Sequence, residues 1–342
     1  MDTDRPASSK MFDISDTDSG ISSEITEAEP EVNSPTYSSS FMDPIEAAMK
    51  PDNVLEKFVE VSGKRYLNDN TVKCYLPADR EEGIREHDRH YIDRIVWEGN
   101  YSAPVSENLS LGASVLDVGC GAGAWVIDTA LDYSESVFVG IDIVPSFPEN
   151  HPPNTVFFKC NVLNGLPFPD NTFDFVRQGL LLVGIDWQLW RDKVVSELTR
   201  VTKPGGYIEI MDVYEESTNP GIISGKIDTY LFENLRKAGI NPASGTGVIK
   251  TFNGFKDKVI VAPIEVRTYH LGKKAGRIGE ATLKCMVDAY RAMKIIFAHI
   301  MRVTEEEFEE ILIDFEKECN EATLCKTRYR AIIQKRLDAY DN

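Results

Sequence analysis

A short apolar segment that runs into three alternate glycines constrains this chain more than any other feature. Residues 115–124 read VLDVGCGAGA, a buried strand followed by Gly119, Gly121 and Gly123. Because glycine has no Cβ, backbone N–H groups at such a turn can close on a ligand at the N-terminus of the following helix. The pattern predicts an α/β fold with a nucleotide-cofactor site at this turn.

Two cofactors fit such a turn. The spacing Gly119-x-Gly121-x-x-Ala124 also satisfies the loose dinucleotide fingerprint. A second apolar segment ends at Asp142, where a doubly wound fold puts a carboxylate beside the ribose hydroxyls of either NAD or S-adenosylmethionine. No Tyr-x-x-x-Lys pair or other hydride-transfer constellation follows the fourth expected strand. The later segments therefore disfavour a dehydrogenase.

The order of the motifs resembles a known enzyme class. Asp117, the glycines and Asp142 are followed by PFPDNTFDFV at 167–176 and LTRVTKPGG at 198–206. In this order they are similar to the successive motifs of class I S-adenosylmethionine-dependent methyltransferases. The flanking segments look like those of the fungal LaeA-like group, so the resemblance extends over residues 62–336.

The resemblance implies a Rossmann-like, doubly wound seven-stranded sheet with helical lid insertions, and S-adenosyl-L-methionine as cofactor. The cofactor-binding core is expected at 105–213 and the cover and last strands at 214–342. The other expected elements are a short helix at 43–60, a loop or hairpin at 62–77, a helix at 222–239, a strand at 259–270, helices at 277–302 and 304–322, and a last strand at 327–333.

The resemblance also implies roles for particular residues. The three glycines approach the amino-acid end of the cofactor, Asp142 takes the ribose hydroxyls, and Asn161 and Val162 flank the adenine. Asn161 stands where Asp is more usual in the class, and its amide oxygen can still accept from the adenine amino group. The expected cofactor-binding residues are Asp117, Gly119, Cys120, Gly121, Gly123, Trp125, Asp142, Ile143, Asn161, Val162, Arg177 and Gln178. The cysteines are scattered without a C-x-x-C pair, so no metal site is expected.

A polar helix at 79–98 is expected to lie across the cofactor crevice as a lid. Asp79 is a suitable N-cap. One face carries His87, His90, Tyr91 and Arg94, and it is too polar for a core-facing stripe. His90 is the candidate catalytic base or substrate orienter, and Tyr91 and Tyr101 are candidate substrate contacts. The alternative for His90 is a packed, hydrogen-bonded helix histidine.

The N-terminal 50 residues differ from the rest of the chain. They hold eleven Asp or Glu against three Lys or Arg, a net charge of −8 out of −18 for the whole chain. Such a segment cannot bury enough apolar surface to offset its chain entropy, which predicts a disordered tail. Within it, the segment DSGISS at 18–23 resembles a phosphodegron, and a plain linker is the alternative.

Charge and hydropathy narrow the partners. The acidic net charge opposes a phosphate backbone, so a nucleic-acid partner is disfavoured. The sequence has no apolar run of membrane-spanning length and no secretion signal, which predicts a cytoplasmic or nuclear protein. Two functions stay open: a methyltransferase acting on a small molecule or a protein side chain, with a link to secondary metabolism implied by the resemblance, or a regulatory methyltransferase-like subunit of a nuclear complex with little turnover.

Overall fold

The computed structural model of the protein describes residues 58–69, 71–214, 220–240 and 245–337. The acidic tail predicted for residues 1–50, with its DSGISS segment, lies outside these ranges. The described residues all belong to one unit of the chain, which begins at Pro35.

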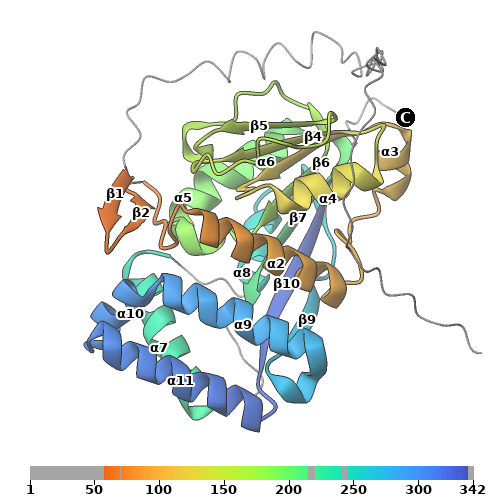
Figure 1. Cartoon of the computed structure of the whole chain (residues 1–342). Helices are drawn as coiled ribbons and strands as arrows, with labels where there is room; N and C mark the ends of the chain where they lie inside the picture. Colours follow the sequence, from red (N-terminus) through yellow and green to blue (C-terminus); the bar gives the residue numbers. More distant parts are fainter. Residues whose placement is uncertain (1–57, 70, 215–219, 241–244, 338–342) are drawn as a thin grey trace, which may run out of the picture. The chain divides into compact units, whose positions relative to one another are not determined.

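A mixed sheet forms the centre of this unit, in the order β5-β4-β3-β6-β7-β10-β8, with β9 also paired to β10 (Figure 1). The strands from β3 to β7 pair in parallel, and β10 runs antiparallel to its neighbours. Their bounds are β3 Ser114–Val118, β4 Val137–Asp142, β5 Thr155–Lys159, β6 Phe173–Gly179, β7 Thr202–Tyr214, β8 Val259–Val261, β9 Glu265–His270 and β10 Cys325–Lys335. The predicted doubly wound α/β sheet is confirmed.

The sixth predicted strand, 259–270, is broken into β8 and β9. Ala262 still donates its N–H to Ile332, but the next residue is Pro263, which has no N–H to give to the ladder. Both pieces pair with β10, so the sheet keeps seven strand positions. The prediction of one continuous strand was wrong for this physical reason.

The order of the strands sets the place of the site. The chain goes from β3 outward to β4 and β5, and then returns to place β6 on the other side of β3. In open α/β sheets a ligand crevice forms at the carboxyl ends of the strands where the direction reverses. That position lies between the ends of β3 and β6.

Helices cover both faces of the sheet. Leu109 and Val126 pack with Val115 and Phe138 on one face, so α3 and α4 cover it. On the other face, Leu198 of α6 belongs to the cluster that also contains α8. The bounds of these elements are α3 Ser106–Leu111, α4 Ala124–Asp132, α5 Trp187–Leu189, the π-turn Trp190–Val194, α6 Val195–Val201 and α8 Gly245–Asn253.

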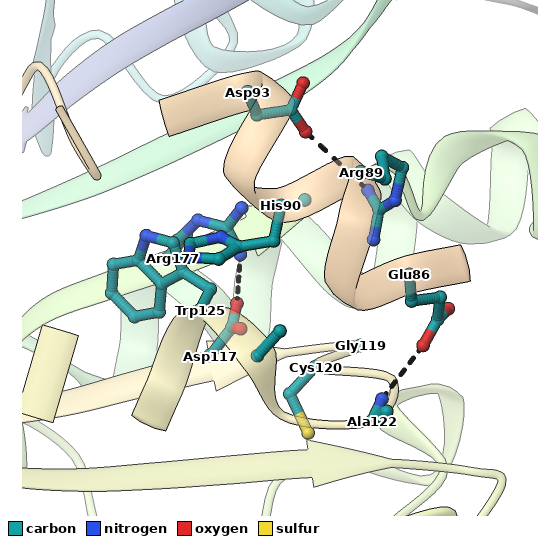
Figure 2. A pocket seen from close by; sticks show the side chains of 12 residues that line it. Glu86, Arg89, His90, Asp93, Asp117, Gly119, Cys120, Ala122, Trp125 and Arg177 are labelled. Atoms are coloured by element: carbon teal, nitrogen blue, oxygen red, sulfur yellow. Dashed lines mark hydrogen bonds and ion pairs between the residues drawn. The ribbon is translucent and has the colours of Figure 1, made fainter. Parts of the chain in front are cut away.

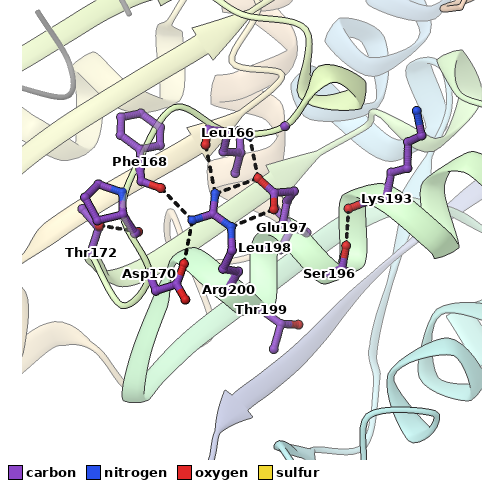
Figure 3. Close-up of polar contacts among 12 residues, drawn as sticks. Leu166, Phe168, Asp170, Thr172, Lys193, Ser196, Glu197, Leu198, Thr199 and Arg200 are labelled. Atoms are coloured by element: carbon purple, nitrogen blue, oxygen red, sulfur yellow. Dashed lines mark hydrogen bonds and ion pairs between the residues drawn. The ribbon is translucent and has the colours of Figure 1, made fainter. Parts of the chain in front are cut away.

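Arg200 on α6 explains why the PFPDNTFDFV segment is so distinctive (Figure 3). Its guanidinium donates to the carbonyl oxygens of Leu166 and Phe168 and to the carboxylates of Asp170 and Glu197, at 2.7–2.9 Å. A single side chain thus satisfies two carbonyl groups and one carboxylate of the loop that leads into β6. This motif holds the strand in place and touches no part of the crevice.

Four helices form a cap with its own apolar cluster: α7 Ile222–Lys237, α9 Gly276–Ala292, α10 Lys294–Met301 and α11 Glu305–Glu321 (Figure 1). The predicted helix 277–302 is interrupted at Met293, the C-cap of α9. Beyond the break, the Phe297 ring stacks on Phe308 with centroids 5.0 Å apart. The interruption lets Phe297 of α10 pack on α11. The local sequence around Met293 does not predict this change of direction.

Two elements precede the sheet. β1 (Phe58–Val61) and β2 (Lys64–Leu67) form a hairpin whose turn has positive φ at both Ser62 and Gly63, as tight two-residue hairpins require. The helix predicted for 43–60 is therefore wrong at its end, and the rest of it lies outside the described residues. α2 (Arg80–Val96) follows, and the Asp79 side chain accepts from the Glu82 N–H, as the predicted N-cap does.

Candidate functional site

The turn after β3 adopts a backbone that only glycine takes easily. The φ angles of Gly119, Gly121 and Gly123 are +74°, +56° and +80°. A Cβ on Gly123 would lie 2.7 Å from the Phe157 ring, closer than any carbon–carbon contact allows. Both conformation and space therefore exclude larger side chains here.

The backbone N–H groups of the turn residues from Gly119 to Gly123 all have acceptors, and that of Gly123 donates to the carbonyl of Cys120 within the turn. Those of Gly119 and Cys120 donate to the carbonyl of Ile141 on β4. The other two meet carboxylates: Gly121 donates to Asp142 at 2.9 Å, and Ala122 donates to Glu86 of α2, also at 2.9 Å. The turn thus already binds carboxylate oxygens, consistent with its place at the positive end of α4.

α2 lies over this turn, and a cavity separates the two (Figure 2). The helix lines it with Glu86, Arg89, His90 and Asp93. The lower wall comes from Asp117, the glycine turn, Trp125 and, on β6, Arg177 and Gly179. This cavity lies at the crevice between β3 and β6, the place that the strand order favours.

Asp117 and Arg177 form a buried ion pair on the cavity wall. Arg177 Nη1 donates to Asp117 Oδ1 at 2.8 Å, and its guanidinium lies 4.6 Å from the centroid of the Trp125 ring. Burial raises the pKa of the Asp117 carboxyl, and the charge of Arg177 opposes that rise. The second oxygen, Oδ2, is buried without a hydrogen-bond partner. A buried acceptor without a partner is costly, and a cationic ligand group would satisfy it.

His90 is buried against an acidic residue of α4. Its Nε2 lies 2.9 Å from Oδ2 of Asp128, which also accepts from Asn100, while Arg94 donates to the other oxygen at 2.6 Å. Burial lowers the pKa of the imidazole, and Asp128 opposes that change. A neutral ring that donates from Nε2 to the carboxylate keeps Nδ1 as an acceptor.

On the side of β4 and β5, Asp142 uses both carboxylate oxygens. One accepts from Gly121 and the other from Val144, and burial raises the pKa of this carboxyl to about 6. Asn161 is fixed too, because its oxygen accepts from Leu163 N and its amide donates to Thr71 at 3.2 Å. Ile143 and Val162 pack in the apolar cluster beside them. Burial raises the pKa of the Cys120 thiol well above its usual range, which disfavours its thiolate.

Nine of the residues predicted to contact ligands lie outside the lining of this cavity: Gly121, Gly123, Asp142, Ile143, Asn161, Val162, Gln178, Tyr91 and Tyr101. Gln178 is fully buried on the opposite side of β6 from Arg177 and accepts from the Trp190 indole at 3.0 Å, since side chains alternate along a strand. Tyr91 is 39% exposed, because it follows the inward-facing His90 by one position on α2. Tyr101 bonds its hydroxyl to those of Tyr133 and Ser106.

Glu86, Arg89 and Asp128 were not predicted as site residues. Glu86 lies four positions before His90, and Arg89 lies three positions after Glu86. A helical face through His90 and Glu86 could therefore include all three residues. The helix has two polar faces of similar character in the sequence. The face predicted to point inward was the one with His87, His90, Tyr91 and Arg94. Asp128 lies one turn beyond Trp125 on the helix that follows the glycines, which was a usable signal.

Comparison with known proteins agrees with this geometry. Residues 115–206 match the family described as methyltransferase domain. The secondary metabolism regulator laeA of Coprinopsis cinerea is 32% identical over 174 residues, 49% of this chain and 42% of that protein. The protein-methionine methyltransferase laeA of Emericella nidulans is 33% identical over 104 residues, 30% of this chain and 27% of that protein. Among solved structures, the YcgJ protein of Bacillus subtilis aligns with a TM-score of 0.43 at 17% identity, over 73% of this chain and 100% of that one.

Residues 115–206 therefore match a methyltransferase domain, and the chain resembles the LaeA group, as its motifs predicted. It covers less than half the length of each of these two curated relatives. None of the helices in the described part of the chain has the length and apolar character that a membrane-spanning segment requires.

Proposed function

We propose that this protein is an S-adenosyl-L-methionine-dependent methyltransferase whose cofactor binds between the glycine turn and α2. The observation that carries the proposal is the turn itself: three glycines with positive φ at the switch point of the sheet, with Asp142 at the end of the neighbouring strand. Glycine is required at this turn, because a Cβ at Gly121 would meet the Glu86 carboxylate and one at Gly123 would meet the Phe157 ring.

Asp117 in the cavity and the residues at the ends of β4 and β5 beside it suit the two ends of such a cofactor. Asp117 Oδ2, buried and unpartnered, would accept from the ammonium of the methionine part. Asp142 would take the ribose hydroxyls, and Ile143, Asn161 and Val162 would flank the adenine. The cofactor supplies a methyl group already activated by its sulfonium, so the protein has chiefly to position the acceptor and exclude water.

In this proposal His90 removes the proton of the methyl acceptor. Its buried, neutral imidazole lines the cavity, and Asp128 fixes which nitrogen carries the hydrogen. This is the arrangement that a general base needs at neutral pH. The role is specific to His90, since His87 is exposed on the outer side of the same helix.

The acceptor is a small molecule or a protein side chain. One relative is named a protein-methionine methyltransferase and others secondary metabolism regulators, which favours a protein acceptor and a regulatory partner in the cytoplasm or nucleus. A methyltransferase-like subunit with little turnover of its own is the second candidate. Glu86 supports it, since this residue already occupies an N–H of the glycine turn.

The cofactor is tested by isothermal titration calorimetry of the full chain with S-adenosylhomocysteine and with NADH. The proposal expects heat from the first ligand and none from the second. Clear binding of NADH without binding of S-adenosylhomocysteine would contradict it.

The role of His90 and the class of acceptor are tested by transfer of a tritiated methyl group from S-adenosylmethionine into cell extract, followed by separation of proteins from small molecules. His90→Ala should lower the incorporated label by about 100-fold or more, as removal of a general base does. His87→Ala, on the outer face, is the matched control and should stay within about twofold. Equal incorporation by the His90→Ala variant would show that this histidine only packs, and a cofactor-binding protein that transfers no label would favour the regulatory subunit.

A further inference from the structure

α2 meets the glycine turn through a carboxylate. Glu86, half-buried, accepts from the Ala122 N–H at 2.9 Å (Figure 2). This N–H lies just before α4, where backbone donors and the helix dipole favour an anion. The Glu86 carboxylate also lies where a Cβ of Gly121 would be. The protein's own side chain therefore occupies the anion-binding point of the turn.

Arg89, one helical turn further along, brings the opposite charge to the same cavity. Its Nε is buried without a hydrogen-bond partner, and the carboxylate recorded beside this guanidinium, that of Asp93, is 4.0 Å away. A buried donor that remains unpaired is costly, so a ligand carboxylate would be favoured here. The cavity also contains the unpartnered Asp117 Oδ2.

With Glu86 in this position there is little space. The free volume of the cavity is about 20 Å³, the room of about one water molecule. Sites for small ligands are about 300–1,000 Å³. A ligand with an amino-acid and a nucleoside part can enter only if side chains of α2 move away from the turn.

Resting on the proposed function, we infer that Glu86 and Arg89 make the site selective for ligands with an α-carboxylate: the ligand's carboxylate replaces Glu86 on the Ala122 N–H and pairs with Arg89. Glu86 is then an internal competitor, and Arg89 is a binding residue. The exchange should also lower the pKa of Asp142 once Glu86 moves away, because the negative charge of Glu86 contributes to raising that pKa.

The inference predicts opposite effects for two residues one turn apart. Calorimetric titrations use S-adenosylhomocysteine, which has the α-carboxylate, and methylthioadenosine, which lacks the whole amino-acid part. Glu86→Gln should bind S-adenosylhomocysteine about fivefold to tenfold more tightly, because the competing anion is gone. Arg89→Gln should bind it at least about tenfold more weakly, because a charge-assisted pair is lost. Methylthioadenosine should change by less than about twofold in both variants.

Two controls make the result specific. Asp88→Asn removes one negative charge from the exposed face of α2 and should leave both affinities unchanged. Arg89→Lys keeps the charge and should recover part of the affinity that Arg89→Gln loses, which guards against a general defect of folding.

Failure of the charge exchange and failure of the proposed function would give different results. If the wild-type protein binds S-adenosylhomocysteine and Glu86→Gln leaves its affinity equal or weaker, or if Arg89→Gln has no effect, the charge exchange is overturned and the proposed function stands. If neither the wild type nor the variants bind either adenosine ligand, both the exchange and the proposed function fail.

Discussion

α2 separates two regions that are built in opposite ways. On one side is the cap, where Phe297, Phe308 and Phe315 are fully buried in an apolar cluster. On the other side is the crevice, where Asp117 and Arg177 are almost as deeply buried but charged. Apolar packing stabilises a fold directly, whereas buried charges cost free energy unless each is paired. We therefore expect the cap to contribute mainly to stability, and the crevice to serve the proposed ligand.

Within these two regions, the buried side-chain atoms without a hydrogen-bond partner follow the same division, while others, such as Asn100 Oδ1 and Gln178 Nε2, lie in neither region. The described part of the cap contributes none of the buried side-chain atoms that lack a hydrogen bond, while the crevice contributes Asp117 Oδ2 and Arg89 Nε. Stability and ligand binding should therefore respond to different substitutions.

The largest expected effect is at the glycine turn. Gly121→Val should abolish measurable binding of S-adenosylhomocysteine, because its φ of +56° and the nearby Glu86 leave no room for a branched side chain. Gly225→Ala in the cap helix α7 is the matched control, since a Cβ there meets only ordinary contacts. Calorimetry measures both, and normal affinity in Gly121→Val would show that the ligand binds elsewhere.

In the cap, Phe297→Ala should lower the free energy of unfolding by about 3–5 kcal/mol, because it leaves a cavity beside Phe308. The affinity of the folded protein for S-adenosylhomocysteine should stay within about threefold. Ile313→Ala on α11, whose side chain is 58% exposed, should change stability by less than about 0.5 kcal/mol. Urea denaturation and calorimetry measure these quantities. A large loss of affinity in Phe297→Ala would mean that cap and crevice act as one unit.

A smaller effect is expected from pH. Burial raises the pKa of Asp142 from 3.8 to about 6, so the folded, unliganded protein holds this proton below pH 6. A ligand that needs the carboxylate should bind about tenfold more weakly at pH 5 than at pH 7. The free energy of unfolding should change in the opposite direction. Burying the Asp142 carboxylate destabilises the folded protein above pH 6, and this cost vanishes as the pH falls toward 3.8. Titrations across this range test the binding, and Asp142→Asn should flatten the profile.

The smallest effect is expected for Tyr91→Phe. The Tyr91 ring makes edge contacts with His87 and His90, which phenylalanine keeps, and the side chain is 39% exposed. Stability should change by less than about 0.5 kcal/mol, and the affinity for S-adenosylhomocysteine should stay the same. A marked fall in affinity would indicate that Tyr91 contacts the ligand after all.

The sequence predicted the sheet and the glycine turn well, because apolar strands, glycine spacing and the Asp79 cap are local signals. It predicted less of what depends on packing. The break at Met293 has no proline or glycine to mark it, and the hairpin at Ser62 was expected only as a loop or hairpin. The break at Met293 depends on packing against a distant helix, where Phe297 meets Phe308, and the hairpin depends on a positive φ at Ser62 that its residue type does not predict.

The same limit applies within the site. His90 was predicted from its helical position and lines the cavity, but which polar face of α2 points inward depends on the contact between Glu86 and Ala122 across the fold. Side-chain direction on β6 likewise turned Gln178 toward Trp190 and Arg177 toward Asp117. Residue type alone does not tell these two neighbours apart.

The central claim, that the ligand binds between the glycine turn and α2 and leaves the cap unchanged, is tested most directly by amide hydrogen exchange with and without S-adenosylhomocysteine. The account predicts slower exchange in residues 80–96 and 119–124, and little change in α10 and α11. Slower exchange in α10 and α11, with none in α2 or the glycine turn, would contradict it.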